Sequence, residues 1–201
     1  MKRGMLLVIF ISFVVLDIHS QNWDINTLHQ INSWNSKFIR NYNKGISQTE
    51  PYIAIGIPIS MTAIAWINND QNLMKNAGYI GTSVAGTLVI TYGLKYLINR
   101  ERPYESYPEK VYPYSKEHSP SFPSSHTATA FALATSISIK YPKWYIIAPS
   151  ALWACSVGIS RMNEGVHYPS DVMAGAAIGV GCAIANIYIN RWLNRILLGV
   201  N

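Results

Sequence analysis

The apolar residues of this chain are gathered into runs that alternate with shorter polar segments. Five such runs follow residue 50, and they cover residues 51–67, 77–98, 126–141, 144–159 and 172–189. Runs of this length are typical of membrane-spanning helices, which need about 20 predominantly apolar residues. The second run is rich in small residues, which allow close helix packing in lipid. The pattern predicts an all-α, polytopic membrane bundle of about five spans.

The first twenty residues form a unit of their own. Lys2 and Arg3 are followed by an apolar stretch at 5–15, and the unit ends at Ser20. This order is typical of a secretory signal peptide cleaved after Ser20, whereas an uncleaved signal anchor would raise the number of spans to six. Both interpretations place the chain from Gln21 onwards on the periplasmic side of a bacterial inner membrane.

The segment 21–50 is polar, but apolar residues recur in it at roughly helical spacing. These residues are Trp23, Ile25, Leu28, Ile31, Trp34 and Phe38. Such a stripe predicts an amphipathic helix that lies on the membrane surface, or equally one that packs across the bundle. We assign no chemistry to this segment, and we take residues 51–201 as one membrane domain.

The composition also favours a membrane protein. Of the 201 residues, 49% are hydrophobic and only 13% are charged, and this charged fraction is about half that of an ordinary soluble domain. The net charge of +6 does not indicate a nucleic-acid partner, because the lysines and arginines form no basic stripe. Cys155 and Cys182 lie inside apolar runs, so we interpret them as packing residues and neither as a disulfide nor as metal ligands.

The cations between the runs predict the orientation of the bundle. If Gln21 lies outside, the cytoplasmic segments carry five cations, namely Lys75, Lys140, Lys143, Arg191 and Arg195. This distribution follows the positive-inside rule. The two long polar breaks, residues 99–125 and 160–171, then lie together on the outer face.

The break at residues 160–171 reads S-R-M-N-E-G-V-H-Y-P-S-D. Asp171 follows His167 by four residues, so its carboxylate can hold one ring nitrogen and leave the other free to attack an electrophile. Arg161 adds a planar cation suited to phosphate. Simpler roles fit as well: Ser170 or Asp171 could cap the next helix, Arg161 could be an interfacial cation, and His167 could be an ordinary loop histidine.

A second polar stretch, residues 95–103, reads K-Y-L-I-N-R-E-R-P. Lys95 falls in the last turn of an apolar helix, which is an expensive place for a charge unless it faces a polar site. Arg102 precedes Pro103, which ends any helix there. The alternative is a lysine that reaches to the membrane surface from a basic helix end.

The third stretch, residues 122–131, reads F-P-S-S-H-T-A-T-A-F. Ser124 and Ser125 stand where a helix would begin, and the free N–H groups of a helix N-terminus favour anions. His126, in the first turn, could protonate a leaving oxygen. The alternative is a plain serine cap with an incidental histidine.

In chain order the three stretches read K-x6-R-P, P-S-S-H and S-R-x5-H-x3-D. In these motifs the chain resembles the type 2 phosphatidic acid phosphatase (PAP2) superfamily, which includes bacterial class A acid phosphatases and vanadium haloperoxidases. Between Lys95 and Asp171 the resemblance rests on the motifs, and in the rest of the chain it rests on the order of the spans. The usual P-S-G-H has Ser125 in place of its glycine. If that glycine needs a positive φ, the serine is strained there, but it keeps its backbone N–H, so we expect activity to survive.

The resemblance implies a role for each motif residue. His167 would be the nucleophile and form a phosphohistidine, Asp171 would orient it, and His126 would be the general acid and then the general base. The remaining motif residues would bind the phosphoryl oxygens, and they are Lys95, Arg102, Ser124, Ser125 and Arg161. We expect neither a metal nor another cofactor, because these cations and a helix terminus can neutralise a phosphoryl group and no acidic cluster accompanies them.

The expected function is hydrolysis of a lipid phosphate monoester or diphosphate at the periplasmic face. Candidate substrates are undecaprenyl diphosphate, a lipid A phosphate, phosphatidylglycerol phosphate and phosphatidic acid, and we expect the tyrosine-rich loop 104–121 to help choose among them. Membrane lipids are the other expected partners, and no pattern assigns an oligomeric state. The alternatives are a soluble periplasmic acid phosphatase or haloperoxidase, and a non-catalytic lipid-binding or transport protein on the same fold.

Overall fold

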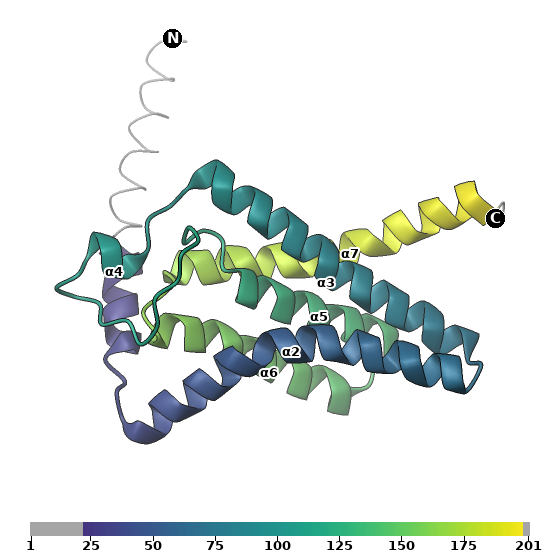
Figure 1. Cartoon of the computed structure of the whole chain (residues 1–201), viewed down its shortest axis with the longest axis horizontal. Coiled ribbons are helices and arrows are strands. Elements are labelled where there is room, and N and C mark those ends of the chain that lie inside the picture. The colour runs from purple at the N-terminus through teal and green to yellow at the C-terminus, as the bar shows by residue number, and fades with distance from the viewer. Residues whose placement is uncertain (1–21, 199–201) are drawn as a thin grey trace, which may run out of the picture.

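The computed structural model describes residues 22–198, so the predicted signal peptide lies outside the described residues. A helix over residues 22–32 comes first and the labelled helices follow it (Figure 1). Their bounds are α2 Lys37–Ile67, α3 Gln71–Ile98, α4 Pro103–Ser106, α5 Ser125–Lys140, α6 Trp144–Asn163 and α7 Pro169–Leu198. No strand occurs in this part of the chain, so the all-α prediction is confirmed.

Each of the five apolar runs lies in a helix of its own, and local signals set several helix ends. The Ser36 hydroxyl accepts a hydrogen bond from an amide in the first turn of α2, and the Asp70 carboxylate accepts two from the first turn of α3, as N-cap residues do. Asn99 adopts a left-handed conformation that ends α3. α2 begins at Lys37 and therefore joins the end of the polar segment 21–50 to the first apolar run.

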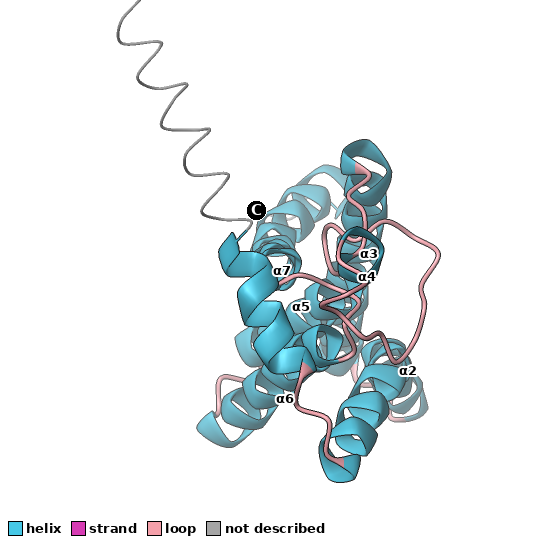
Figure 2. Ribbon diagram, turned by 90° about the vertical axis from the view of Figure 1, so that its left-hand side faces the viewer, coloured by secondary structure: helices cyan, strands magenta, loops and turns pink. Residues whose placement is uncertain are grey.

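α5 lies in the middle of the bundle, with α2, α3, α6 and α7 packed around it (Figure 2). Its buried side chains are small, and they include Ala128, Ala130, Ala132 and Ala134. α7 approaches α5 closely through two glycines. A Cβ on Gly175 would lie 2.6 Å from the main-chain oxygen of Ser124, the N-cap of α5, and a Cβ on Gly179 would lie 2.1 Å from the main-chain oxygen of Ala128 in α5. This contact holds the N-terminal halves of both helices together, where the motif residues lie.

The outer surface of the bundle is apolar. Large side chains such as Ile59 of α2, Leu97 of α3 and Leu152 of α6 are more than 60% exposed, whereas Thr87 and Thr91 are buried in α3. Within the described residues two helices, Lys37–Ile67 and Pro169–Asn190, are long and apolar enough to cross a membrane. Together these features indicate a membrane protein, and the number of five spans stays a prediction.

The amphipathic segment differs from the prediction in two respects. It is broken at residues 33–36 into the helix 22–32 and the start of α2. Ile25 and Leu28 pack against Val111 and Tyr168 next to the polar breaks. The segment also contributes Asp24, which contacts Arg100 and Ser170 next to the motif residues, as described below.

Candidate active site

The fold brings the three motifs to one end of the bundle. Lys95 lies in the last turn of α3, Arg102 directly precedes α4, and Ser124, Ser125 and His126 lie at the start of α5. Arg161 lies in the last turn of α6, and Asp171 lies in the first turn of α7, just after His167. Between the motifs, the Arg102 guanidinium lies against His167, and the Ser124 amide donates a hydrogen bond to the Asp171 carbonyl.

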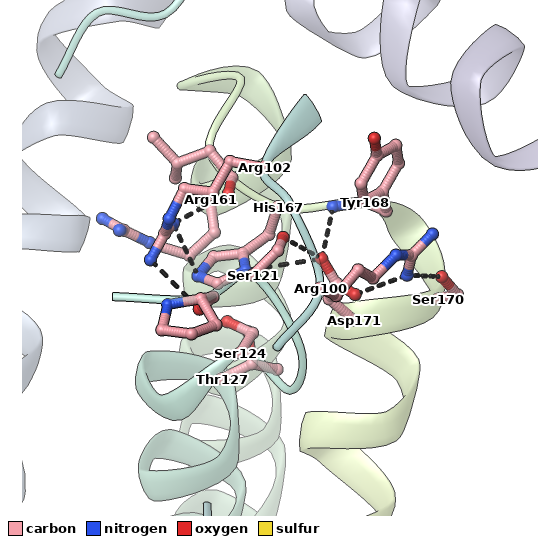
Figure 3. Close-up of polar contacts among 12 residues, drawn as sticks. Arg100, Arg102, Ser121, Ser124, Thr127, Arg161, His167, Tyr168, Ser170 and Asp171 are labelled. Atoms are coloured by element: carbon pink, nitrogen blue, oxygen red, sulfur yellow. Dashed lines mark hydrogen bonds and ion pairs between the residues drawn. The ribbon is translucent and has the colours of Figure 1, made fainter. Parts of the chain in front are cut away.

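His167 lies between Asp171 and Arg102 (Figure 3). Its Nδ1 faces Asp171 Oδ2 at 3.6 Å, which is longer than a hydrogen bond, and its Nε2 lies 3.4 Å from an Arg102 guanidinium nitrogen. Because a guanidinium can only donate, Nε2 is the unprotonated nitrogen and the ring proton is on Nδ1, toward the carboxylate. The lone pair that a nucleophile needs is therefore on the side of the cations.

The carboxylate of Asp171 is fully buried and held from three sides. Oδ2 accepts hydrogen bonds from the Ser121 hydroxyl at 2.5 Å and from the Tyr168 amide at 2.9 Å, while Oδ1 accepts one from Arg100 at 2.6 Å. The predicted role of Asp171, which is to orient His167, thus depends on residues whose identity the motifs do not specify. Ser121 lies just before the second motif, and Arg100 lies inside the first.

Arg100 and Asp24 form a charged pair behind this carboxylate, and neither residue was predicted to belong to the site. Arg100 donates to Asp171 and to Asp24, and its guanidinium stacks 4.0 Å above the Tyr168 ring. Asp24 in turn accepts hydrogen bonds from the Ser170 amide and hydroxyl. The helix 22–32 is thereby attached to the start of α7. Its position inside the first motif, between Lys95 and Arg102, is the sequence feature that could have drawn attention to Arg100.

Lys95 and Arg102 meet at one main-chain oxygen. Lys95 Nζ donates to the carbonyl of Pro120 at 2.5 Å, and Arg102 lies 3.5 Å from the same oxygen. Arg102 also donates to the carbonyl oxygens of Ser119 and Val166, each at 2.8 Å. Both cations are buried, and their side chains face the polar loop. This position was predicted for Lys95, because a charge in the end of an apolar helix is unfavourable unless it faces a polar site.

Arg161 is held by two carboxylates and a hydroxyl. Its guanidinium lies 2.6 Å from Glu117 and 2.8 Å from Glu164, and it donates to Ser47 of α2. Its Nε is buried without a hydrogen-bond partner. Arg161 therefore has one N–H donor that is not used. Of its partners, Glu117 is accessible to solvent, since its side chain is 32% exposed.

Ser124 and Ser125 start α5 as expected, although neither side chain caps the helix. The Ser124 hydroxyl lies 2.9 Å from that of Thr127, and the Ser124 amide donates to the Asp171 carbonyl at 3.1 Å. Among the described residues, Asn69 and Asn99 are the non-glycine residues with positive φ. Ser125 is thus unstrained in place of the usual glycine, and its buried hydroxyl has no partner.

Burial and charge set the protonation states in the loops. Burial lowers the pKa of His167 to about 3, although Asp171 acts in the opposite direction, so the imidazole is neutral at physiological pH. Burial alone would raise the pKa of Glu117, but the Arg161 guanidinium overrides it and lowers that pKa. A neutral histidine beside several cations suits attack on an anionic electrophile.

A cavity of about 620 Å³ opens next to these residues, between α2, the loop before α5 and the end of α6. Two motif residues, His126 and Arg161, form part of its wall, together with Glu117 and Glu164. His167 is only 2% exposed and does not line this cavity. His126 also lines a smaller cavity of about 120 Å³ between α2, α3 and α5, whose other residues are mostly apolar.

Comparison with known proteins agrees with this arrangement. The PAP2 superfamily sequence profile matches residues 76–195, which is more than half of the chain. A lipid A 1-phosphatase of Porphyromonas gingivalis is 39% identical over 84 residues, which are 40% of this chain and 19% of that protein. The undecaprenyl-diphosphatase BcrC of Bacillus subtilis is 30% identical over 131 residues, which are 64% of this chain and 65% of that protein.

Among solved structures, Aquifex aeolicus LpxE superimposes with a TM-score of 0.71 at 28% sequence identity. The match covers 83% of this chain and 95% of that one. The chain thus spans less than two thirds of the sequence relatives it matches, but nearly all of this structural neighbour.

Proposed function

The chain belongs to the PAP2 superfamily, and on that premise we propose that it is a lipid phosphatase that works through a phosphohistidine. The observation that carries this proposal is the position of His167. Its neutral ring has Nδ1 toward a buried carboxylate and Nε2 toward Arg102. Few other roles require a buried, neutral histidine placed between a carboxylate and several buried cations.

In the first step, Nε2 of His167 attacks phosphorus, the N–P bond forms and the bond to the leaving oxygen breaks. Lys95, Arg102 and Arg161 bind the three equatorial oxygens, and the first-turn amides of α5 add N–H donors. The negative charge of the bound phosphate stabilises protonated His126, and this imidazolium gives its proton to the leaving oxygen. The positive charge that develops on His167 is balanced by Asp171, which stays ionised through its contact with Arg100.

In the second step, His126 takes a proton from water as the water attacks phosphorus. The N–P bond breaks, inorganic phosphate forms, and His167 returns to its neutral state. For phosphate to reach His167 from the large cavity, the anion would replace Glu117 on Arg161, because this ion pair lies in the cavity wall. If Glu117 stayed in place, its carboxylate and the phosphate would compete for the Arg161 guanidinium.

The smaller cavity supports a lipid as the leaving group. It joins His126 to the outer surface of the bundle, where Ile55 and Tyr92 line it and are about half exposed. An acyl or prenyl tail could lie there in contact with the bilayer while the phosphate enters the polar end. We place the site on the periplasmic face of the inner membrane, on the positive-inside argument, with the helix 22–32 on the same side.

We propose that catalysis needs no metal, because cations of the protein take the role that Mg²⁺ has in many phosphoryl-transfer sites. Within the described residues no group of three or more His, Cys, Asp or Glu is arranged to hold a metal ion. Activity that is unchanged by a chelator is the expected result. Loss of activity in the chelator, restored by magnesium, would show that this part of the proposal is wrong.

The test of the proposed function is phosphate release from a panel of lipid phosphates by purified protein in detergent. The panel holds undecaprenyl diphosphate, a lipid A phosphate, phosphatidylglycerol phosphate and phosphatidic acid. We expect release from at least one of them, abolished in His167→Ala. No release by correctly folded protein would instead favour a non-catalytic lipid-binding protein. Extraction with carbonate would separate the soluble alternative, since a soluble protein would be released.

A further inference from the structure

The large cavity extends well beyond the predicted catalytic residues. At one end it is lined by His126 and Arg161, and at the other by the first two turns of α2. Those turns contribute three cations to the wall, which are Lys37, Arg40 and Lys44. At about 620 Å³ the cavity is within the range that holds a drug-sized ligand. A single phosphate does not fill such a space.

The three cations share one face of α2, because residues 37, 40, 44 and 47 are spaced by three or four positions. Ser47, the last of the series, accepts a hydrogen bond from Arg161. Of the three cations, Lys44 is therefore nearest to the catalytic residues and Lys37 is farthest from them. With a rise of about 1.5 Å per residue, Lys44 lies about 5 Å along the helix from Ser47, Arg40 about 10 Å and Lys37 about 15 Å.

Among the residues whose side chains the structure describes, 22–190, the two outer cations have no anionic partner. Neither Lys37 nor Arg40 makes an ion pair or a side-chain hydrogen bond to another residue of that range. Arg40 is instead held with its guanidinium 4.2 Å above the Tyr114 ring, which fixes its plane and leaves its N–H edge free. Lys44 differs, since it acts electrostatically on the Glu164 carboxylate.

Uncharged hydrogen-bonding side chains fill the wall between the cations. Asn41 and Gln48 lie on α2, and Tyr114 and Ser115 lie on the opposite loop. In this wall the carboxylates are Glu117 and Glu164, and both are engaged by Arg161. The outer part of the cavity is therefore basic and rich in hydrogen-bonding groups, which suits a large polar headgroup with an anion at its far end.

We propose that Lys37 and Arg40 form a subsite for a second anionic group of the substrate, remote from the phosphate that is cleaved. The inference rests on the proposed function, and it narrows the substrate to lipids with a large, hydroxyl-rich headgroup that is anionic at both ends. The two phosphates of a diphosphate share one oxygen and stay close together. A diphosphate would reach Lys44 and would not reach Lys37.

The test compares three lipids in neutral detergent micelles: a disaccharide lipid with a phosphate at each end, its counterpart with one phosphate, and a prenyl diphosphate. The variant Lys37→Ala/Arg40→Ala removes two exposed charge contacts. We expect KM for the bisphosphorylated lipid to rise about threefold to thirtyfold with kcat unchanged. KM for the other two lipids should stay within about twofold.

The matched control is Lys110→Ala/Lys116→Ala. These two lysines are exposed on the loop at the same end of the molecule and do not line the cavity, so this variant loses the same charge from the same surface. An equal rise in KM in the control, or an equal effect on all three lipids, would show general attraction of anionic micelles and would overturn the proposal. Arg40→Glu alone provides a second variant, with the same selective loss expected.

Binding separates this proposal from the proposed function. Dissociation constants of the three lipids are measured on His167→Ala protein, with and without Lys37→Ala/Arg40→Ala, so that no turnover is needed. Selective weakening for the bisphosphorylated lipid supports the subsite even if no lipid is hydrolysed. Hydrolysis of the single-phosphate lipid with no selectivity in binding or in KM would leave the phosphatase standing and refute the subsite.

Discussion

Replacement of Arg100 by alanine should slow catalysis without weakening substrate binding. Asp171 Oδ1 has Arg100 as its hydrogen-bond partner, whereas Oδ2 is held by Ser121 and the Tyr168 amide. Without Arg100 the carboxylate can rotate about its remaining contacts and change its position against His167. The 3.6 Å separation of His167 and Asp171 is already long, so a small displacement matters.

The magnitude follows from this geometry. A displacement of about 1 Å in a positioned catalytic group can cost about a hundredfold in rate, and loss of a group that orients a catalytic residue commonly costs about tenfold to a hundredfold. We therefore expect kcat to fall by about 10- to 100-fold in Arg100→Ala. KM should stay within about threefold, because Arg100 contacts Asp24, Ser170 and Asp171 and none of the proposed phosphate ligands.

The assay is steady-state phosphate release by wild type, Arg100→Ala and Arg100→Lys, with melting temperature measured in the same detergent. Arg100→Lys keeps the charge but cannot reach both aspartates with one planar group, so an intermediate kcat is expected. Asp24→Asn should lower kcat in the same direction. A wild-type kcat in folded Arg100→Ala, or a rise in KM alone, would refute the role of Arg100 in positioning Asp171.

Three further predictions follow from the packing and the charges. Gly179→Val should lower the melting temperature by several degrees and reduce activity, because a Cβ there would lie 2.1 Å from a main-chain oxygen of α5. Gly181→Ala should behave as wild type, because a Cβ there would have no atom within 4 Å. Equal effects of the two variants would contradict the close contact. Burial lowers the pKa of His167 to about 3, whereas the unfolded chain takes up this proton below about pH 6.5. The melting temperature should therefore fall as the pH is lowered from 6.5 to 4, and it should fall less in His167→Gln. Identical slopes of melting temperature against pH in the two proteins would refute this. Glu117→Gln should strengthen inhibition by inorganic phosphate several-fold, because it removes the carboxylate that competes for Arg161; unchanged inhibition would mean that phosphate does not bind there.

The fold could largely be predicted from the sequence because its main signals are local. Apolar runs identified the five long helices, and the three motifs carried fixed internal spacings. Asp171 follows His167 by four residues, so the proximity of the two side chains could be predicted from local chain geometry alone. The charge pattern placed the two polar breaks on one face, but the family resemblance was needed to join the three motifs into one site, since no local signal brings Lys95 near Asp171.

The contacts that were missed are long-range ones. Asp24 meets Ser170 across 146 residues of sequence and Arg100 across 76, and the polar segment that contains Asp24 shows only an amphipathic stripe. Arg100 stands two positions before Arg102, so spacing could not tell which arginine faces the nucleophile and which its carboxylate. The strain considered for Ser125 likewise depended on a backbone angle that the sequence does not give.

The central claim is that His167 becomes phosphorylated during turnover. The most direct measurement is a rapid acid-free quench of enzyme mixed with substrate labelled at the scissile phosphate, followed by identification of any labelled peptide. The account predicts transient label, stable to base and labile to acid, on the peptide that contains His167, and no label in His167→Ala. Turnover at the normal rate with label on another residue, or with no label at any time before the first turnover is complete, would contradict it.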